Sequence, residues 1–304
     1  MAHPPTEPAT TRLLPPDLLV RLRSLQLRTR RVVDGVLTGL HRSPLHGASV
    51  EFAEHKEYAP GDEIRHLDWR VFGKSDKYYV KRYQNETNLQ ATLVLDSSAS
   101  MRYRSPDAPA SKWDYASSLA AALAYLVLRQ QDAVGLLLVS EAQRLFVPPR
   151  AQNTHLQPIC EAILSHPPGE RAGTALARAA AELAERSGRR GLLFIISDFF
   201  ERDTSYFAAL AELERRGHHI TLLQVLDPWE ITFPFKDMTT FRSLETGHSL
   251  IAEPRLIGDS YRTEIQRFLA QIRTEATRAG MDHRLIQTTT PVDRALVDLF
   301  AGKA

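Results

Sequence analysis

Short apolar runs of strand-forming residues alternate with helix-length segments over most of this 304-residue chain. Four nearly continuous apolar runs are predicted to be strands, at 91–96, 132–139, 191–196 and 220–226. Continuous runs of this kind are typical of strands that are buried on both faces of a parallel sheet. Strands that alternate with helices form a mostly parallel sheet with helices on both faces. The sequence therefore predicts a doubly wound α/β fold.

Helical periodicity separates these runs. The first helical segment, 112–130, keeps one face apolar through residues that recur at helical spacing: Trp113, Ala116, Ala120, Leu123 and Val127. The other predicted elements are a short strand at 143–147 that adjoins the second strand, helices at 152–164, 174–187, 204–216 and 259–279, a strand at 284–287 and a last helix from Val292.

The composition along the chain indicates several segments. The insertion after the fourth strand is rich in aromatic residues and has a Thr246-Gly247 turn, so one or two hairpins are expected there. Together with the charged upstream segment it is expected to form one small β-rich satellite module. The predicted boundaries are a disordered N-terminus at 1–14, an N-terminal helix and charged module at 15–88, the α/β domain at 89–290 with an insertion at 228–258, and a C-terminal helix at 291–304.

Charge and cysteine content limit the functional classes. The net charge of +2 is too small to indicate nucleic-acid binding. One cysteine, Cys160, excludes an internal disulfide and suits a reducing compartment. No apolar stretch approaches the roughly 18 residues of a membrane span, and the N-terminus does not resemble a signal peptide. We expect a cytoplasmic protein with no integral membrane segment; the basic helix that begins near Pro15 packs on its own domain or contacts anionic lipid peripherally.

The strand at 91–96 ends in a group of oxygen-bearing side chains. Asp96, Ser98 and Ser100 follow its apolar residues at alternate positions. Open α/β sheets place their ligands at the carboxyl ends of strands. One carboxylate and two hydroxyls in the same loop are hard ligands that suit Mg²⁺ or Mn²⁺ better than zinc or copper. Taken alone, the pattern is weak, because Ser and Asp also cap helices.

Two further segments are predicted at the same edge of the sheet. Thr174 lies where a loop enters a helix, and Asp198 follows the strand at 191–196. With Asp96 and the two serines, they bring two carboxylates and three hydroxyls from three loops. So few acidic ligands do not saturate a divalent cation, and Mg²⁺ usually keeps waters. A coordination position therefore stays open to a carboxylate from outside.

The set Asp96-x-Ser98-x-Ser100, Thr174 and Asp198 resembles the complete metal-ion-dependent adhesion site of the von Willebrand factor A domain. The resemblance spans roughly residues 89–290. That family has a doubly wound sheet, and its metal typically binds an acidic side chain of a partner. The resemblance therefore implies a Mg²⁺ or Mn²⁺ site formed by these five residues and a protein partner.

A second resemblance lies upstream. Residues 58–62, Tyr-Ala-Pro-Gly-Asp, with Arg65, Asp68-Trp69 and Val80-Lys81, are similar to the signature of the bacterial domain-of-unknown-function 58 (DUF58) family. Members combine this segment with a von Willebrand factor A-like domain and commonly occur beside MoxR-type AAA+ ATPases. The resemblance implies an adaptor that binds such an ATPase or its client.

Enzymatic alternatives fit the residues less well. An aspartyl-nucleophile phosphatase with Asp96 as nucleophile needs an acid two residues later, and position 98 is Ser. The chain also lacks a Gly-x-Ser-x-Gly elbow and a phosphate-binding loop that ends in Gly-Lys-Ser/Thr. The prediction is a non-enzymatic, metal-dependent interaction module. A scaffold whose metal only stabilises the loop, or a metal-dependent phosphohydrolase, is the alternative.

Overall fold

A computed structural model describes residues 25, 26, 29, 33, 49–57, 79–86, 89–142, 144–186, 190–201 and 203–300. The predicted disordered N-terminus, most of the predicted basic helix and the charged segment that contains Asp62, Arg65 and Trp69 lie outside these residues. For 49–57 and 79–86, the description is limited to the backbone.

A six-stranded sheet forms the centre of the molecule, in the order β10-β7-β6-β3-β4-β5. Its pairs are parallel except for the edge strand β5, which is antiparallel to β4. The mostly parallel α/β fold is therefore confirmed. Its strands are β3 (Gln90–Asp96), β4 (Ala133–Val139), β5 (Arg144–Arg150), β6 (Leu192–Ser197), β7 (His219–Leu226) and β10 (Asp282–Gln287).

The order of the strands determines where a ligand can bind. The chain passes from β3 outward through β4 to β5, then returns to β6 on the other side of β3 and continues to β7 and β10. The strand order therefore reverses between β3 and β6. Doubly wound sheets bind ligands in the crevice at the carboxyl ends of the strands at this reversal point. In this chain those ends are Asp96 and Ser197.

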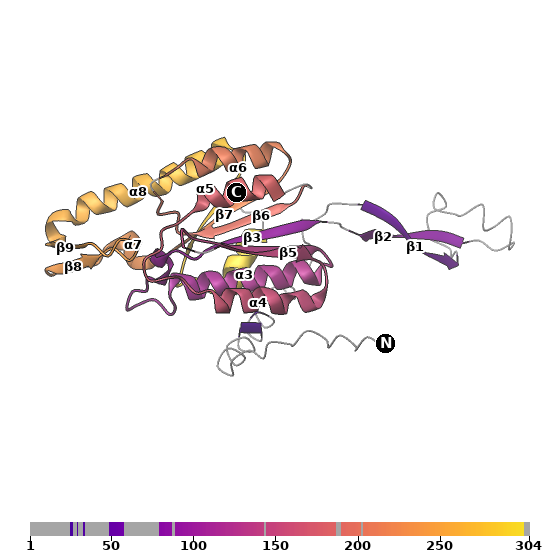
Figure 1. Ribbon diagram of the computed structural model, residues 1–304, viewed down its shortest axis with the longest axis horizontal. Helices are drawn as coiled ribbons and strands as arrows, with labels where there is room; N and C mark the ends of the chain where they lie inside the picture. The colour runs from indigo at the N-terminus through magenta and orange to yellow at the C-terminus, as the bar shows by residue number, and fades with distance from the viewer. Residues whose placement is uncertain are drawn as a thin grey trace, which may run out of the picture.

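Helices cover both faces of the sheet (Figure 1). On β3, Leu93 and Leu95 pack into the apolar core on one face, whereas Val94 packs into the core on the other. This alternation follows from the two-residue period of a strand. The first face carries α3 (Lys112–Arg129), α4 (Leu156–Ser165) and α9 (Val292–Phe300), and the second carries α5 (Leu176–Arg186), α6 (Tyr206–Arg215) and α8 (Pro254–Arg278).

Helix α3 differs from the helix with one apolar face that the sequence predicted. Residues on nearly all its sides are buried, including Lys112 and Ser117. The reason is its central position, because the sheet, α4 and α9 all pack against it. A helix enclosed in this way needs small residues on its remaining sides, and the alanines of α3 provide them. The chain's single cysteine, Cys160, is fully buried in the neighbouring α4.

The insertion begins with a helix that the sequence analysis missed. Helix α7 (Pro228–Thr232) precedes one hairpin, β8 (Thr239–Arg242) and β9 (Ser249–Ala252). Asp227 caps α7, and Pro228 occupies its first turn, where a missing N–H costs nothing. Helix α8 then starts at Pro254, five residues earlier than predicted.

The predicted satellite module is not confirmed. Upstream strands β1 (Ser49–Glu57) and β2 (Tyr79–Glu86) pair with each other, and β8 pairs with β9 in a separate sheet. Figure 1 draws the two sheets at opposite ends of the molecule.

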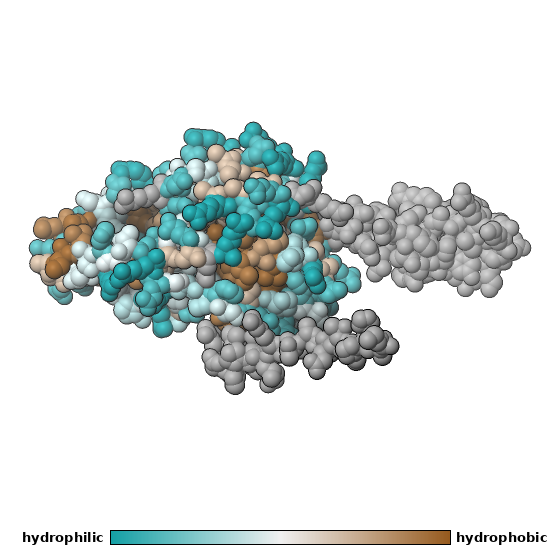
Figure 2. Space-filling view, viewed as in Figure 1, coloured by the Kyte–Doolittle hydropathy of each residue, from teal (hydrophilic) through white to brown (hydrophobic). Residues whose placement is uncertain are grey.

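The surface near the β8–β9 hairpin is unusually apolar. Figure 2 shows apolar side chains gathered at this end of the molecule, where Met238, Leu250, Ile251 and Leu256 are exposed. Within the described residues, no helix is both long enough and apolar enough to cross a membrane.

Candidate functional site

Three loops meet at the carboxyl ends of the central strands. The N–H of Ala99 donates to the carbonyl of Ala172 at 2.7 Å, and the N–H of Glu141 donates to the carbonyl of Gly173 at 2.9 Å. Gly173 approaches Glu141 so closely that an added Cβ would lie 2.8 Å from its carboxylate. The loops after β3 and β4 are therefore both tied to the loop before α5, and Gly173 allows the close approach.

Asp96 is the centre of this loop cluster. Its side chain is fully buried; Oδ1 accepts the N–H of Ser98 at 2.8 Å, and Oδ2 accepts the hydroxyls of Ser197 at 2.6 Å and Thr174 at 3.3 Å. The hydroxyls of Ser98 and Ser100 lie 3.0 Å apart. The structure thus brings together four of the five predicted residues, joined by Ser197.

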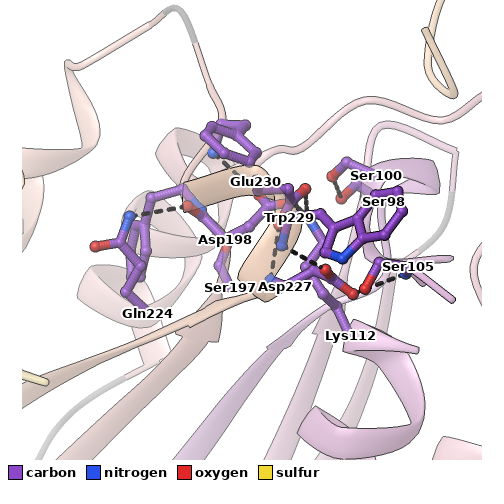
Figure 3. A network of polar contacts seen from close by, with 12 residues as sticks. Ser98, Ser100, Ser105, Lys112, Ser197, Asp198, Gln224, Asp227, Trp229 and Glu230 are labelled. Atoms are coloured by element: carbon purple, nitrogen blue, oxygen red, sulfur yellow. Dashed lines mark hydrogen bonds and ion pairs between the residues drawn. The ribbon is translucent and has the colours of Figure 1, made fainter. Parts of the chain in front are cut away.

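Asp198, the fifth predicted residue, is also fully buried but has a different partner (Figure 3). The Lys112 ammonium lies 2.6 Å from Asp198 Oδ2 and 2.7 Å from Glu230 Oε1 on α7. The N–H of Phe200 donates to Asp198 Oδ1 at 3.0 Å, and Gln224 Nε2 donates to its carbonyl at 3.2 Å. Both carboxylate oxygens of Asp198 are therefore already engaged.

The two buried carboxylates differ in charge balance. Burial, together with the negative charge of Asp198, raises the pKa of Asp96 to about 7, against the hydrogen bonds from Ser197 and Ser98. Asp96 has no cationic partner among the described residues. Burial lowers the pKa of Lys112, but Asp198 and Glu230 outweigh it and raise that pKa above its ordinary value. Lys112 therefore stays charged, and Asp96 is the carboxylate without a neutralising partner.

The backbone is strained beside Asp198. Phe199 has φ of 61°, in the left-handed region that non-glycine residues rarely adopt. Its ring is fully buried against Tyr206, and its N–H donates to the Ser197 hydroxyl at 2.9 Å. Packing and this hydrogen bond hold the conformation. Such strain clusters at functional sites.

Residues 54–275 match the family described as "Protein of unknown function DUF58". This chain belongs to the DUF58 family. Among curated proteins, uncharacterized proteins of Mycobacterium bovis and Mycobacterium tuberculosis are 30% identical to it over 266 residues, covering 86% of this chain and 81% of their own length.

Solved structures with a related architecture include an aerotolerance-related membrane protein from Bacteroides fragilis, at 16% identity and a TM-score of 0.47, which covers 70% of this chain and 96% of that chain. The protein BatB from Bacteroides thetaiotaomicron has 17% identity and a TM-score of 0.44, covering 70% and 97%. A von Willebrand factor type A protein from Catenulispora acidiphila has 12% identity and a TM-score of 0.39, covering 73% and 43%.

The donor atoms of this DUF58 protein fit a hard divalent cation. A buried carboxylate without a cationic partner is costly, and carboxylate and hydroxyl oxygens are ligands of the kind that Mg²⁺ and Mn²⁺ accept. Within the described residues, no cluster of three or more His, Cys, Asp or Glu side chains is placed to hold a metal. A metal at this edge would therefore depend on the hydroxyls of Ser98, Ser100 and Thr174 beside Asp96.

The sequence analysis missed two charged residues of the site. Lys112 opens α3 directly after the cap Ser111, a position at which lysine usually reaches solvent, so nothing in the sequence indicated its role. Glu230 did leave a signal, because Asp227 and Glu230 form a capping box with Pro228 between them. That pattern predicts a helix start directly after β7, at the ligand-binding edge of the sheet.

Proposed function

We propose that this chain is a metal-dependent protein–protein interaction module and not an enzyme. Asp96 and the hydroxyls of Ser98, Ser100 and Thr174 would hold Mg²⁺ or Mn²⁺, and Asp198 would act through water because Lys112 already occupies it. A bound metal supplies positive charge and a coordination position for an acidic side chain of the partner. The residues of the chain orient that position through the hydrogen bonds of the three loops.

One observation carries this proposal. Asp96 is buried at the reversal point of the sheet, is surrounded by hydroxyls and has no cationic partner among the described residues. Its neighbour Asp198 is neutralised by Lys112. The chain therefore supplies its own cation for one carboxylate and leaves the other for a cation from solution.

The proposal also covers the class of protein that this chain binds. DUF58 members commonly occur beside MoxR-type AAA+ ATPases, and we propose that this chain links such an ATPase to its client. This step is supported by the resemblance of residues 58–62, Tyr-Ala-Pro-Gly-Asp, to the DUF58 signature. These residues lie outside the described part of the chain.

Affinity capture tests the function directly. The tagged full chain is incubated with a MoxR-type ATPase and with host lysate, in Mg²⁺ or in chelator, and bound proteins are identified. Asp96→Ala is the test variant, and Asp259→Ala, which removes an exposed carboxylate on α8, is the matched control. We expect capture in Mg²⁺ by the wild type and the control, and loss of capture in chelator and in Asp96→Ala.

Two outcomes contradict the proposal. Capture that persists in chelator and in Asp96→Ala leaves the scaffold alternative, in which a metal only stabilises the loop. Metal-dependent hydrolysis of phosphate esters that Asp96→Ala abolishes assigns a phosphohydrolase instead.

A further inference from the structure

Glu245 is an acidic residue of the insertion that reaches the loop cluster. It lies on the turn between β8 and β9, which is closed by the N–H of Ser243 donating to the His248 carbonyl at 2.8 Å. The N–H of Gly247 donates to the carbonyl of Ser243 at 2.9 Å, and Gly247 has φ of 74°, which glycine adopts freely. The turn therefore presents Glu245 from a defined backbone.

Glu245 lines the same cavity as Thr174, one of the predicted metal-site residues. Burial raises the pKa of Glu245, the negative charge of Asp198 adds to this, and a hydrogen bond from the Ser100 side chain opposes it. Its Oε1 is buried and has no hydrogen-bond partner among the described residues. A carboxylate oxygen removed from water without a donor is unfavourable unless a cation or a donor joins it.

Taken together, these contacts suggest a role for the residue. We infer that Glu245 is an internal ligand: its carboxylate occupies the metal's open coordination position until an acidic side chain of the partner displaces it. This inference rests on the proposed function, because it assumes a metal at Asp96, Ser98 and Ser100.

The hairpin is built so that it can move. Strands β8 and β9 have four residues each and pair only with each other among the described strands. A two-stranded ribbon of this length is marginally stable by itself. It is attached through Phe241, whose ring stacks on Phe233 at 5.5 Å and meets Phe235 edge-on at 5.0 Å. Phe241 pairs with Leu250 just before the turn. The turn with Glu245 can therefore lift while the aromatic cluster holds the strands of the hairpin.

Cavities on the two sides of the turn differ in charge balance. One, of about 990 Å³, has four acidic residues in its lining, Glu141, Glu201, Asp203 and Glu245, against one arginine, Arg242. The other, of about 350 Å³, has three arginines, Arg102, Arg171 and Arg242, against one acidic residue, Glu170; within the described residues these arginines form no ion pair. An acidic segment would be repelled on the first side and attracted on the second. The partner segment therefore carries at least two carboxylates, one that replaces Glu245 and one that pairs with the arginines.

Mn²⁺ alone tests the internal ligand. Calorimetry measures its affinity, and water-proton relaxation per bound ion measures how many coordination positions hold exchanging water. Replacing Glu245 by Gln should weaken Mn²⁺ binding by at least about tenfold and increase the relaxation, because water takes the vacated position. The matched control is Glu253→Gln, an exposed carboxylate just after β9.

The outcomes separate this inference from the proposed function. If the wild type binds Mn²⁺ and Glu245→Gln changes neither readout, the internal ligand is refuted and the metal site stands. If the wild type binds no Mn²⁺, both the metal site and the internal ligand are refuted.

A short oligoglutamate peptide tests the direction of approach. In saturating Mn²⁺ it should bind Glu245→Gln several-fold more tightly than the wild type, because no internal carboxylate has to leave. Binding to Arg171→Gln should be several-fold weaker. An oligolysine peptide of the same length is the control. Equal binding of both peptides, or no effect of Arg171→Gln, contradicts the acidic-partner assignment.

Discussion

Lys112 is the residue that balances the negative charge behind the loops. Its ammonium has no exposed surface and contacts two carboxylates, Asp198 and Glu230. It also lies 5.0 Å from the centre of the Phe200 ring, a distance at which a cation is attracted to an aromatic face. Removal of one partner from such a group leaves uncompensated charge in the interior, which costs far more than loss of a surface ion pair.

Lys112→Met should therefore destabilise the protein by about 3–5 kcal/mol, because Asp198 and Glu230 remain buried without their cation. Urea denaturation at pH 7 measures the loss. The double variant Lys112→Met/Glu230→Gln should recover part of it, since one of the two carboxylates is then neutral. A loss below about 1 kcal/mol would show that water or another cation already serves these carboxylates.

Residue types explain which parts of the site could be predicted. Asp96, Ser98 and Ser100 follow one another directly after a strand, so their shared loop could be read from sequence. Lys112 and Asp198 are 86 positions apart, and Lys112 and Glu230 are 118 apart. No local pattern encodes a contact of that kind, since it depends on how α3 and α7 pack against the same strand end. The distinction between a free and a neutralised carboxylate therefore required the structure.

Helix α7 depends on its cap because it has only five residues. Asp227 accepts the N–H of Trp229 at 2.9 Å and, on its other oxygen, the N–H of Ser105 at 2.8 Å, while its own N–H donates to Glu230 at 2.9 Å. The capping residue thus ties α7 to the segment before α3. It also fixes Glu230 beside Lys112.

Replacing Asp227 by Ala should cost about 2–3 kcal/mol, which is more than an ordinary cap, because the buried N–H of Ser105 loses its acceptor as well. Chemical denaturation gives the value. Asp227→Asn keeps an acceptor for Trp229 and should cost less. Equal losses in both variants would mean that the negative charge, and not the hydrogen bonds, stabilises this end of the insertion.

Strand β10 carries a titratable residue, His283, that is connected to Asp198 through the side chain of Gln224. His283 Nε2 lies 3.0 Å from Gln224 Oε1, and Gln224 in turn donates to the Asp198 carbonyl. Burial, with Arg273 and Arg284 nearby, lowers the pKa of His283 to about 4. The unfolded chain therefore binds more protons than the folded protein between about pH 4 and pH 6.5.

Stability should fall as pH decreases through that window, and His283 should account for about 1–2 kcal/mol of the loss after allowance for its partial exposure. Denaturation of wild type and His283→Gln at pH 4.5 and pH 7 isolates this share, because glutamine can keep the bond to Gln224 without titrating. His219→Gln, at an exposed position, is the control. The same pH dependence in His283→Gln and wild type would contradict the assignment.

Element boundaries show where sequence periodicity reaches its limit. The strands of the sheet and the helices between them are close to their predicted positions, because long apolar runs and helical spacing are strong local signals. The start of α8 at Pro254 was missed, since its first turns bury only Pro254 and Gly258 and leave Leu256 exposed, so they carry no apolar stripe. Proline at the first helical position was the available signal.

The topology of the whole molecule would couple binding of the proposed metal to the stability of the fold. The loops that hold Asp96, Thr174 and Asp198 start or end on different elements, so they come together only in the folded chain. A metal that joins them would therefore bind the folded chain and not the unfolded one. Ligands of this kind stabilise the folded state in proportion to the logarithm of their concentration.

Mg²⁺ at about 100 times its dissociation constant should therefore raise the free energy of unfolding by about 2.7 kcal/mol and the Tm by several degrees. Differential scanning calorimetry measures the shift. In Asp96→Asn the shift should vanish, and the metal-free variant should be at least as stable as metal-free wild type at pH 8, since a buried carboxylate with a pKa of about 7 has been removed. A Tm shift that survives in Asp96→Asn would place the metal elsewhere.

Cys160 in α4 gives the molecule a built-in reporter of its own opening. Its thiol is fully buried, and burial raises its pKa to about 12, so at neutral pH it is both protonated and out of reach of reagents. A thiol-modifying reagent can therefore react only after the core around α4 opens. The rate of modification under native conditions then reports how often the core opens. Because the chain has one cysteine, each modified molecule carries a single adduct. The fraction of molecules with the added mass therefore gives the rate of opening.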